Sequence, residues 1–257
     1  MGPTKTQKQK LKQWYLENQR PLPWRKTSNP YKIWISETML QQTTATAVIP
    51  FYKRFTKRFP TVKALAEAPL EQVYEAWAGL GYYSRARNLH KCAQQILRLE
   101  EFPDNHQDLM DLPGIGPYTA RAISSICFDE SVGVLDGNVI RFLSRFENLP
   151  VEWWKTSGRK QLQEMADRWV KNMPAATMNQ ALMEMGATIC LPKTPKCLLC
   201  PLQKSCEGFK ANTLEKRPLA KPKKSKELWS LETHVVKRKG RIAIVKNSYS
   251  PFLKNQW

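Results

Sequence analysis

Four cysteines near residue 200 carry the clearest chemical signal in the sequence. Cys190, Cys197, Cys200 and Cys206 follow the spacing C-x6-C-x2-C-x5-C, which places four soft thiolate ligands within seventeen residues. Structural zinc sites usually take their ligands as two close pairs, whereas here only Cys197 and Cys200 form such a pair. One close pair flanked by single cysteines is compatible with the corners of a [4Fe-4S] cluster. The spacing alone slightly favours iron–sulfur and leaves zinc open.

Two carboxylates could carry acid–base chemistry. Glu37 lies in SETMLQQT among apolar neighbours, where burial would raise its pKa and keep it protonated as an acid. Asp136 lies in VLDGNV, directly before Gly137, where an N-terminal helix cap is the ordinary interpretation. Breaking a glycosidic bond needs an acid for the leaving group and an anion beside the oxocarbenium ion. The pair fits that chemistry, although the position of Asp136 by itself favours the cap.

The segment LPGIGPYTA, residues 112–120, predicts a phosphate-binding turn between two helices. Gly114 and Gly116 permit close approach that side chains would block, and Pro117 suits the first position of a helix. Exposed N–H groups at a helix start, reinforced by the helix dipole, form an anion site. This is the helix-hairpin-helix signature, and the alternative is an ordinary turn between helices.

The charge balance identifies nucleic acid as the leading partner. The chain carries 41 Lys and Arg against 22 Asp and Glu, a formal net charge of +19, which attracts polyanions. A basic surface for solubility or for anionic membranes is the alternative. No stretch approaches the ~18 apolar residues of a membrane span, and the N-terminal residues 1–20 lack the apolar run of a secretory signal. We therefore expect an intracellular protein with no membrane partner.

The segments that must position these residues are predicted to be helices. Apolar residues recur every three to four positions in Val62–Ala78 and Ser84–Leu99, and sustained period-two alternation is missing from the first 225 residues. The body is therefore expected to be all-helical. Residues Lys216–Lys226 contain six basic residues and two prolines and are typical of a linker. The following HVVKRKGRIAIVKN predicts a β-hairpin with a turn at Gly240.

Taken together with LPW and GLGYYSRARNL, these motifs resemble the adenine DNA glycosylase family, MutY, from about Leu22 to Cys206. That family belongs to the helix-hairpin-helix DNA glycosylases with an iron–sulfur cluster. The resemblance implies an all-α, two-domain fold with a [4Fe-4S] cluster loop, followed by a short truncated β segment. It also implies that the four cysteines hold the [4Fe-4S] cluster, and it overrides the cap interpretation of Asp136.

The expected domain boundaries follow from the same resemblance. They are a six-helix-barrel domain containing the helix-hairpin-helix at 22–132, a cluster domain from 1–21 and 133–209, a basic linker at 210–226, and a fragment of a Nudix-like domain at 227–257. In the family, the Nudix-like domain inspects the base opposite adenine, and this segment resembles only its opening strands. We therefore expect adenine excision with reduced preference for 8-oxoguanine over guanine.

The activity that the resemblance implies is monofunctional base excision repair on double-stranded DNA. Adenine mispaired with 8-oxoguanine or guanine would be flipped into a pocket and removed by hydrolysis. By matched position, Glu37 resembles the acid that protonates adenine, Asp136 the group that stabilises the sugar cation, and Asn138 a residue that organises the catalytic water or Asp136. Tyr118 stands where strand-cleaving relatives carry a lysine that forms a Schiff base, so base removal without strand cleavage is expected.

Further residues match substrate-binding positions of the family. Those expected to surround the flipped base or the DNA are Trp24, Arg25, Leu40, Gln42, Tyr82, Gln180, Gly114 and Gly116. Gln42 and Tyr82 match residues that enter the duplex at the lesion, whereas core packing is the alternative for Trp24 and Tyr82. Gln180 stands where some members carry Glu, so a second carboxylate at that position is in doubt.

Three other functions stay open at this point. An endonuclease III-like enzyme would lack the Glu of SETMLQQT and carry lysine in place of Tyr118, while a thymine-mismatch glycosylase can share the tyrosine. From a different class, a non-catalytic iron–sulfur DNA-binding protein would fit the charge, the hairpin and the cysteines, and only Glu37 and Asp136 argue against it. We further expect a monomer that associates with DNA, in the bacterial cytoplasm rather than the nucleus.

Overall fold

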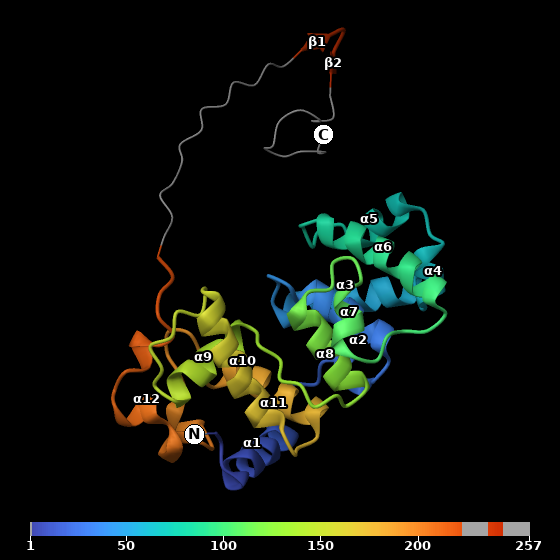
Figure 1. The fold of residues 1–257 in the computed structure, drawn as a ribbon. Helices are drawn as coiled ribbons and strands as arrows, with labels where there is room; N and C mark the ends of the chain where they lie inside the picture. The colour runs from blue at the N-terminus through green and yellow to red at the C-terminus, as the bar shows by residue number, and fades with distance from the viewer. Residues whose placement is uncertain (1, 223–235, 244–257) are drawn as a thin grey trace. The chain divides into compact units, whose positions relative to one another are not determined.

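The computed structural model of the chain describes residues 2–222 and 236–243 and is dominated by helices (Figure 1). The α-helices are α1 (Lys5–Asn18), α2 (Pro30–Leu40), α3 (Ala45–Arg58), α4 (Val62–Ala66), α5 (Leu70–Trp77), α6 (Ser84–Leu99), α7 (His106–Met110), α8 (Pro117–Cys127), α9 (Gly137–Phe146), α10 (Thr156–Val170), α11 (Ala175–Thr188) and α12 (Glu207–Lys210). The 3₁₀ helices are η1 (Pro23–Lys26), η2 (Cys197–Leu199), η3 (Gln203–Ser205) and η4 (Leu214–Lys216), and the strands are β1 (Lys237–Arg238) and β2 (Arg241–Ile242). The predicted all-helical fold is confirmed.

One hydrophobic core lies among α2 to α8. Its largest fully buried side chains are Trp34 of α2, Phe55 of α3 and Trp77 of α5. Helix α2 is buried along almost its whole length and starts with Pro30 at its first turn and the Asn29 side chain as N-cap. A helix buried on all sides presents any polar residue it carries to the interior, which is the situation of Glu37.

A second core gathers helices from both ends of the described body. Leu11 of α1 packs with Leu143 of α9, Trp169 of α10 and Leu182 of α11. Helix α11 contacts α1, α9 and α10 and also touches α8 of the first core, so it joins the two cores (Figure 1). The segment between α8 and α9 therefore runs from one core to the other.

The helix predictions hold with one correction. Helix α6 spans the predicted Ser84–Leu99, but the predicted stretch Val62–Ala78 is two helices, α4 and α5. Pro69 separates them and occupies the N-cap of α5, because proline cannot donate the backbone hydrogen bond that a continuous helix needs at that position. The apolar positions of both pieces still face the first core.

The predicted hairpin is present as the antiparallel pair β1 and β2, in which Lys237 pairs with Ile242. The hairpin lies outside the compact unit formed by residues 1–221. Residues 227–235 and 244–257 of the predicted Nudix-like fragment lie outside the described residues. The predicted domain boundaries stay a prediction.

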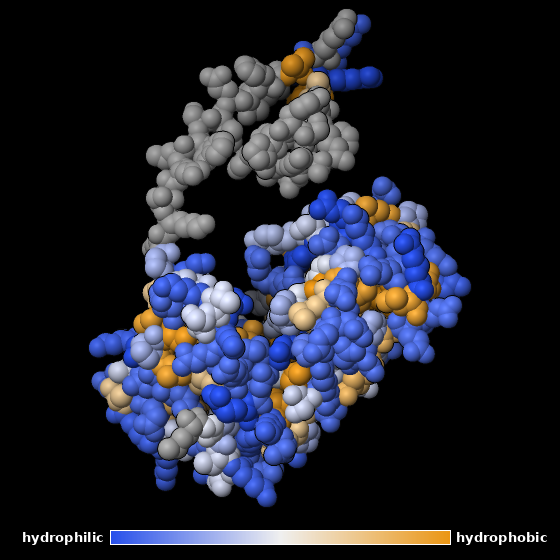
Figure 2. Space-filling view, viewed as in Figure 1, coloured by the Kyte–Doolittle hydropathy of each residue, from blue (hydrophilic) through white to orange (hydrophobic). Residues whose placement is uncertain are grey.

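The surface of the body is mainly polar on the face that is shown. Hydrophilic side chains cover most of the face shown in Figure 2, with scattered apolar residues between them. Among the described helices, none has both the length and the apolar character needed to cross a bilayer.

Candidate active site and cysteine cluster

The helix-hairpin-helix turn joins α7 to α8. Gly114 has φ +79°, in the left-handed region, and a Cβ added there would lie 2.7 Å from Cβ of Asn88, so glycine is required on both counts. Helix α8 starts with Pro117 after Gly116, and no side chain caps it. The first N–H groups of α8 are therefore free of a side-chain partner at the end of the helix that attracts anions.

Glu37 lies near the end of α2 with 4% of its surface exposed. The hydroxyl of Tyr118, in the first turn of α8, donates to Oε2 of Glu37 at 2.6 Å. The pKa of Glu37 is raised to about 7, mainly by burial and also by the nearby Asp136, against the opposing effects of the hydrogen bond from Tyr118 and the charge of Arg25. At neutral pH the group can therefore both hold and release a proton.

Asp136 is the N-cap of α9. Its Oδ1 accepts from the backbone N–H of Val139 at 2.7 Å, and its Oδ2 accepts from Nδ2 of Asn138 at 2.8 Å. The expectation that the cap interpretation is overridden was therefore wrong, because the carboxylate makes the cap contact in full. Burial raises the pKa of Asp136, and these hydrogen bonds work against that rise. One carboxylate thus serves the helix and also faces the site.

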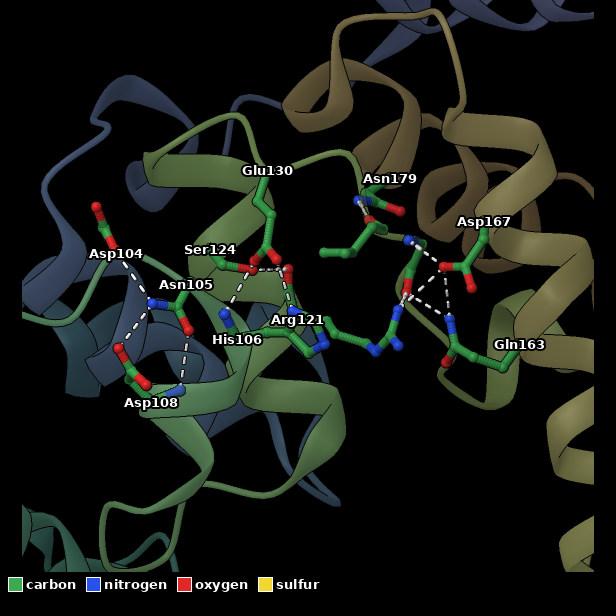
Figure 3. A network of polar contacts seen from close by, with 12 residues as sticks. Asp104, Asn105, His106, Asp108, Arg121, Ser124, Glu130, Gln163, Asp167 and Asn179 are labelled. Carbon is green, nitrogen blue, oxygen red and sulfur yellow. Dashed lines mark hydrogen bonds and ion pairs between the residues drawn. The ribbon is translucent and has the colours of Figure 1, made fainter.

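A polar network fixes the extended segment that leads to Asp136 (Figure 3). The backbone N–H of Gly133 donates to Oδ1 of Asp167 at 2.7 Å, and Arg121 of α8 donates to the same oxygen at 3.0 Å. The amide of Asn179 accepts from the N–H of Val134 at 2.8 Å. Side chains from α8, α10 and α11 therefore hold this segment, which sets where Asp136 lies.

One cavity of about 400 Å³ brings most of the predicted site residues together. The predicted residues that line it are Trp24, Arg25, Glu37, Leu40, Tyr118, Asp136, Asn138 and Gln180. Its volume falls in the range of small-molecule pockets, and it combines an apolar wall with a few convergent polar groups. It can accept a planar heterocycle beside an acid and a carboxylate.

Sequence reasoning missed an ionic group in this cavity. The Glu184 side chain is fully buried, and its carboxylate accepts from Arg20 at 2.8 Å and from Arg25 at 2.7 Å. These bonds hold the pKa of Glu184 at about 2, although burial alone would raise it. Glu184 follows Gln180 by four residues on α11, so the two share a helix face, and this spacing was the available signal.

The Gln180 side chain is an uncharged amide that accepts a hydrogen bond. Its Oε1 accepts from the hydroxyl of Tyr15 in α1 at 3.0 Å. One helical turn later, the Glu184 carboxylate holds Arg25 in the wall of the cavity.

Gln42, Tyr82 and Gly114 line a different cavity, of about 280 Å³. Gln42 has φ +59° and Tyr82 has φ +48°, both in the left-handed region, and Tyr82 is 61% exposed. The structure thus divides the predicted residues between a buried pocket and an exposed pair beside the glycine turn.

The four cysteines of the predicted cluster line a single cavity with Arg145. Nη1 of Arg145 donates to Sγ of Cys190 at 3.6 Å, and burial with the neighbouring thiols raises the pKa of Cys200 to about 12. In the described part of the chain, no three His, Cys, Asp or Glu side chains are arranged around a single metal ion. Cys92 belongs to the first core, and Cys127 packs against it.

These thiols fit a metal cluster. Partly buried thiols that oppose one another's ionisation become thiolate ligands only when cations compensate their charge. The soft donors surround a cavity, and the buried Arg145 adds a positive charge and a hydrogen bond to sulfur.

Comparison with known proteins places this geometry in context. Residues 35–172 match the model of the HhH-GPD superfamily base excision DNA repair protein. The adenine DNA glycosylase of Buchnera aphidicola from Schizaphis graminum is 38% identical over 248 residues, covering 94% of this chain and 71% of that protein. The human adenine DNA glycosylase is 41% identical over 211 residues, covering 77% of this chain and 38% of that protein.

Solved structures agree on the fold. A thermostable thymine-DNA glycosylase superposes with a TM-score of 0.73 and 27% identity, covering 80% of this chain and 96% of that chain. An endonuclease III bound non-covalently to DNA superposes with a TM-score of 0.64 and 22% identity, covering 82% of this chain and 98% of that chain.

Proposed function

Because the chain belongs to the adenine DNA glycosylase family of the HhH-GPD superfamily, we propose that it removes adenine mispaired with 8-oxoguanine or guanine from double-stranded DNA. The observation that carries the proposal is the single buried cavity shared by Glu37, Tyr118 and Asp136. Adenine must leave the duplex to reach such a cavity, at a cost of a few kcal/mol. The net charge of +19 and the uncapped start of α8 would supply phosphate contacts that offset this cost.

Glu37 is the proton donor in this proposal. A carboxyl with a pKa of about 7 transfers its proton to a ring nitrogen of adenine near neutral pH and makes the base a neutral leaving group. Tyr118 donates its hydrogen bond to Oε2 of Glu37, so Oε1 remains to carry the transferred proton. The same bond stabilises the carboxylate that is left after transfer.

Asp136 stabilises the positive charge that develops on the sugar when the bond to the base breaks. Its two oxygens are oriented by Val139 and Asn138, so it needs no reorganisation during the reaction. Asn138 in turn accepts from Arg141 at 2.8 Å, which fixes its amide. Water then completes the hydrolysis at the sugar carbon.

Strand cleavage by Schiff base formation is not part of the proposed reaction. The residue beside the acid is Tyr118, a phenol that cannot form an imine with the sugar, and burial raises its pKa well above the usual range. The product is therefore an intact strand with an abasic site.

Cys190, Cys197, Cys200 and Cys206 would hold the proposed [4Fe-4S] cluster. When bound, it cross-links the loop between α11 and α12 through iron–thiolate bonds. Arg145 contributes to the same loop directly, because its guanidinium donates to the carbonyls of Leu191 and Pro192 at 2.6 and 2.7 Å.

Replacing Cys200 by Ser is expected to reduce bound iron from about four atoms per chain and to lower the melting temperature, because a ligand and a cross-link are lost. Iron, sulfide and zinc are measured in anaerobically purified protein. Cys127→Ala is the matched control, since this thiol packs at the first core away from the other four, and it should keep its iron. Wild-type protein with zinc and no iron would overturn the iron–sulfur assignment.

An abasic-product assay tests the proposed function. Duplexes containing A opposite 8-oxoguanine, A opposite G, T opposite G, or an oxidised pyrimidine are incubated with the protein and then treated with alkali. The proposal requires cleavage at adenine after alkali and no cleavage before it. Product from the T mispair alone would favour a thymine-mismatch enzyme, strand cleavage without alkali an endonuclease III-like enzyme, and no product a binding protein.

A further inference from the structure

Arg85, in the first turn of α6, makes contacts that the proposed reaction does not use. Its Nη1 donates to the carbonyl oxygens of Thr38 at 3.0 Å, Met39 at 3.1 Å and Gln41 at 2.6 Å. Thr38 and Met39 lie in the last turn of α2 and Gln41 is its C-cap, so no further turn of that helix can satisfy these carbonyls. A guanidinium at this end also complements the negative end of the helix dipole.

The same guanidinium reaches a second segment. Its Nη2 donates to the carbonyl oxygens of Leu80 at 3.1 Å and Gly81 at 3.2 Å. Its carbon lies 5.4 Å from the centre of the Trp77 ring and 5.6 Å from that of the Tyr82 ring. Arg85 is partly buried, and its two terminal nitrogens serve different segments, Nη1 the end of α2 and Nη2 residues 80–81, while Nε has no hydrogen-bond partner among the described residues.

Two of the five contacted carbonyls directly precede residues with left-handed backbone conformations. The Gln41 carbonyl belongs to the peptide plane whose rotation sets φ of Gln42, and the Gly81 carbonyl to the plane that sets φ of Tyr82. Left-handed φ values are strained at non-glycine residues and persist where surrounding contacts fix them. Arg85 holds both planes at once.

We propose that Arg85 is a positioning residue that couples the segments 41–42 and 81–82, so that Gln42 and Tyr82 enter the duplex as one unit when a base leaves the stack. The inference rests on the proposed function and adds to it a single guanidinium that orients both exposed side chains. Gln42, Tyr82 and Arg85 line the same cavity beside Gly114 of the helix-hairpin-helix turn, which would bring the pair to the DNA backbone held there.

Arg85→Lys tests the coupling. A lysine keeps the charge, but its single ammonium cannot serve five carbonyls on two segments as a planar fork does. Single-turnover excision is measured on adenine in a stacked mispair and on adenine opposite an abasic-site analogue, where stacking is already weakened. The variant should lose about 10–100-fold on the first duplex and retain most of its rate on the second.

A double-mutant cycle separates positioning from general destabilisation. In a Gln42→Ala/Tyr82→Ala background, adding Arg85→Lys should lower the rate on the stacked mispair by less than about twofold, because the two side chains that Arg85 positions through the backbone are already removed. Arg98→Lys, exposed at the other end of α6, is the matched control and should change neither rate. Equal losses on both duplexes, or an unchanged loss in the double-alanine background, would overturn the proposal.

Hydrogen exchange tests the coupling without relying on enzymatic activity, so it remains informative if the proposed function is wrong. Hydrogen exchange of wild-type protein and of Arg85→Lys is compared over residues 38–43 and 80–84. Coupling requires that both segments exchange faster together in the variant, with the remaining helices unchanged. If the wild type releases no adenine but both segments respond, the function fails and the coupling stands. Faster exchange in one segment alone, or in neither, contradicts the coupling.

Discussion

Replacing Glu37 by Gln is expected to lower the rate of adenine excision by about 10²–10⁴-fold while leaving duplex binding within a few-fold of wild type. Gln has nearly the same shape and its amide oxygen can still accept from Tyr118, but it has no proton to transfer. Single-turnover rates and the dissociation constant for an uncleaved mispair duplex are the measurements. Excision within a few-fold of wild type would remove Glu37 from the role of acid.

The pH dependence of the wild type follows from the same group. Burial raises the pKa of Glu37 to about 7, so the acid form is present below this pH and is lost as the pH rises through it. The excision rate should therefore fall on the alkaline side of about pH 7. The residual rate of Glu37→Gln should lack this fall, which separates titration of Glu37 from titration of the DNA or of other groups.

The raised pKa of Glu37 also makes the free energy of unfolding depend on pH. In the unfolded chain its pKa is the ordinary 4.5, and in the folded chain it is about 7. Stability from this carboxyl is full below pH 4.5 and is lost as the pH rises through about 7, by ~3 kcal/mol. Relative to wild type, Glu37→Gln should therefore gain stability between these pH values in denaturant titrations. A constant difference between the two proteins would contradict the raised pKa.

Local patterns in the sequence were sufficient for the parts of the fold that depend on neighbouring residues. The apolar spacing of Ser84–Leu99 predicts α6 because a helix of this length needs one continuous face toward a core. The two glycines and Pro117 predict the start of α8 because each supplies a backbone property that holds in any context. The raised pKa of Glu37 was predictable from its apolar neighbours on a buried helix.

Contacts between distant segments could not be predicted from local sequence patterns. Glu184 pairs with Arg20 and Arg25, which lie more than 150 positions earlier in the chain, and only the packing of α1 against α11 brings them together. The bonds from Arg85 to two separate segments depend on tertiary structure in the same way. Asp136 shows a different limit, because the cap interpretation and the functional one were treated as exclusive, whereas the carboxylate that caps α9 also lines the cavity.

The double role of Asp136 leads to the second large effect that we expect. Asp136→Asn should abolish most excision, by about 10²-fold or more, because the negative charge that would stabilise the sugar cation is removed. It should keep the helix cap, because Asn is as good an N-cap as Asp and can still accept from the N–H of Val139, and it should lose only the bond from Nδ2 of Asn138. Single-turnover rates, binding to an uncleaved mispair duplex and thermal melting measure the three quantities.

Asp136→Ala separates the two roles, since it removes both the charge and the cap. It should lose excision to the same extent as Asp136→Asn and in addition lose about 1 kcal/mol of stability through the uncapped start of α9. If instead Asp136→Asn excised adenine at the wild-type rate while Asp136→Ala was merely unstable, the carboxylate would be a cap alone. The positive charge on the sugar would then have to be stabilised by another group, and Glu184 is unsuited to this because both of its oxygens are occupied by arginine.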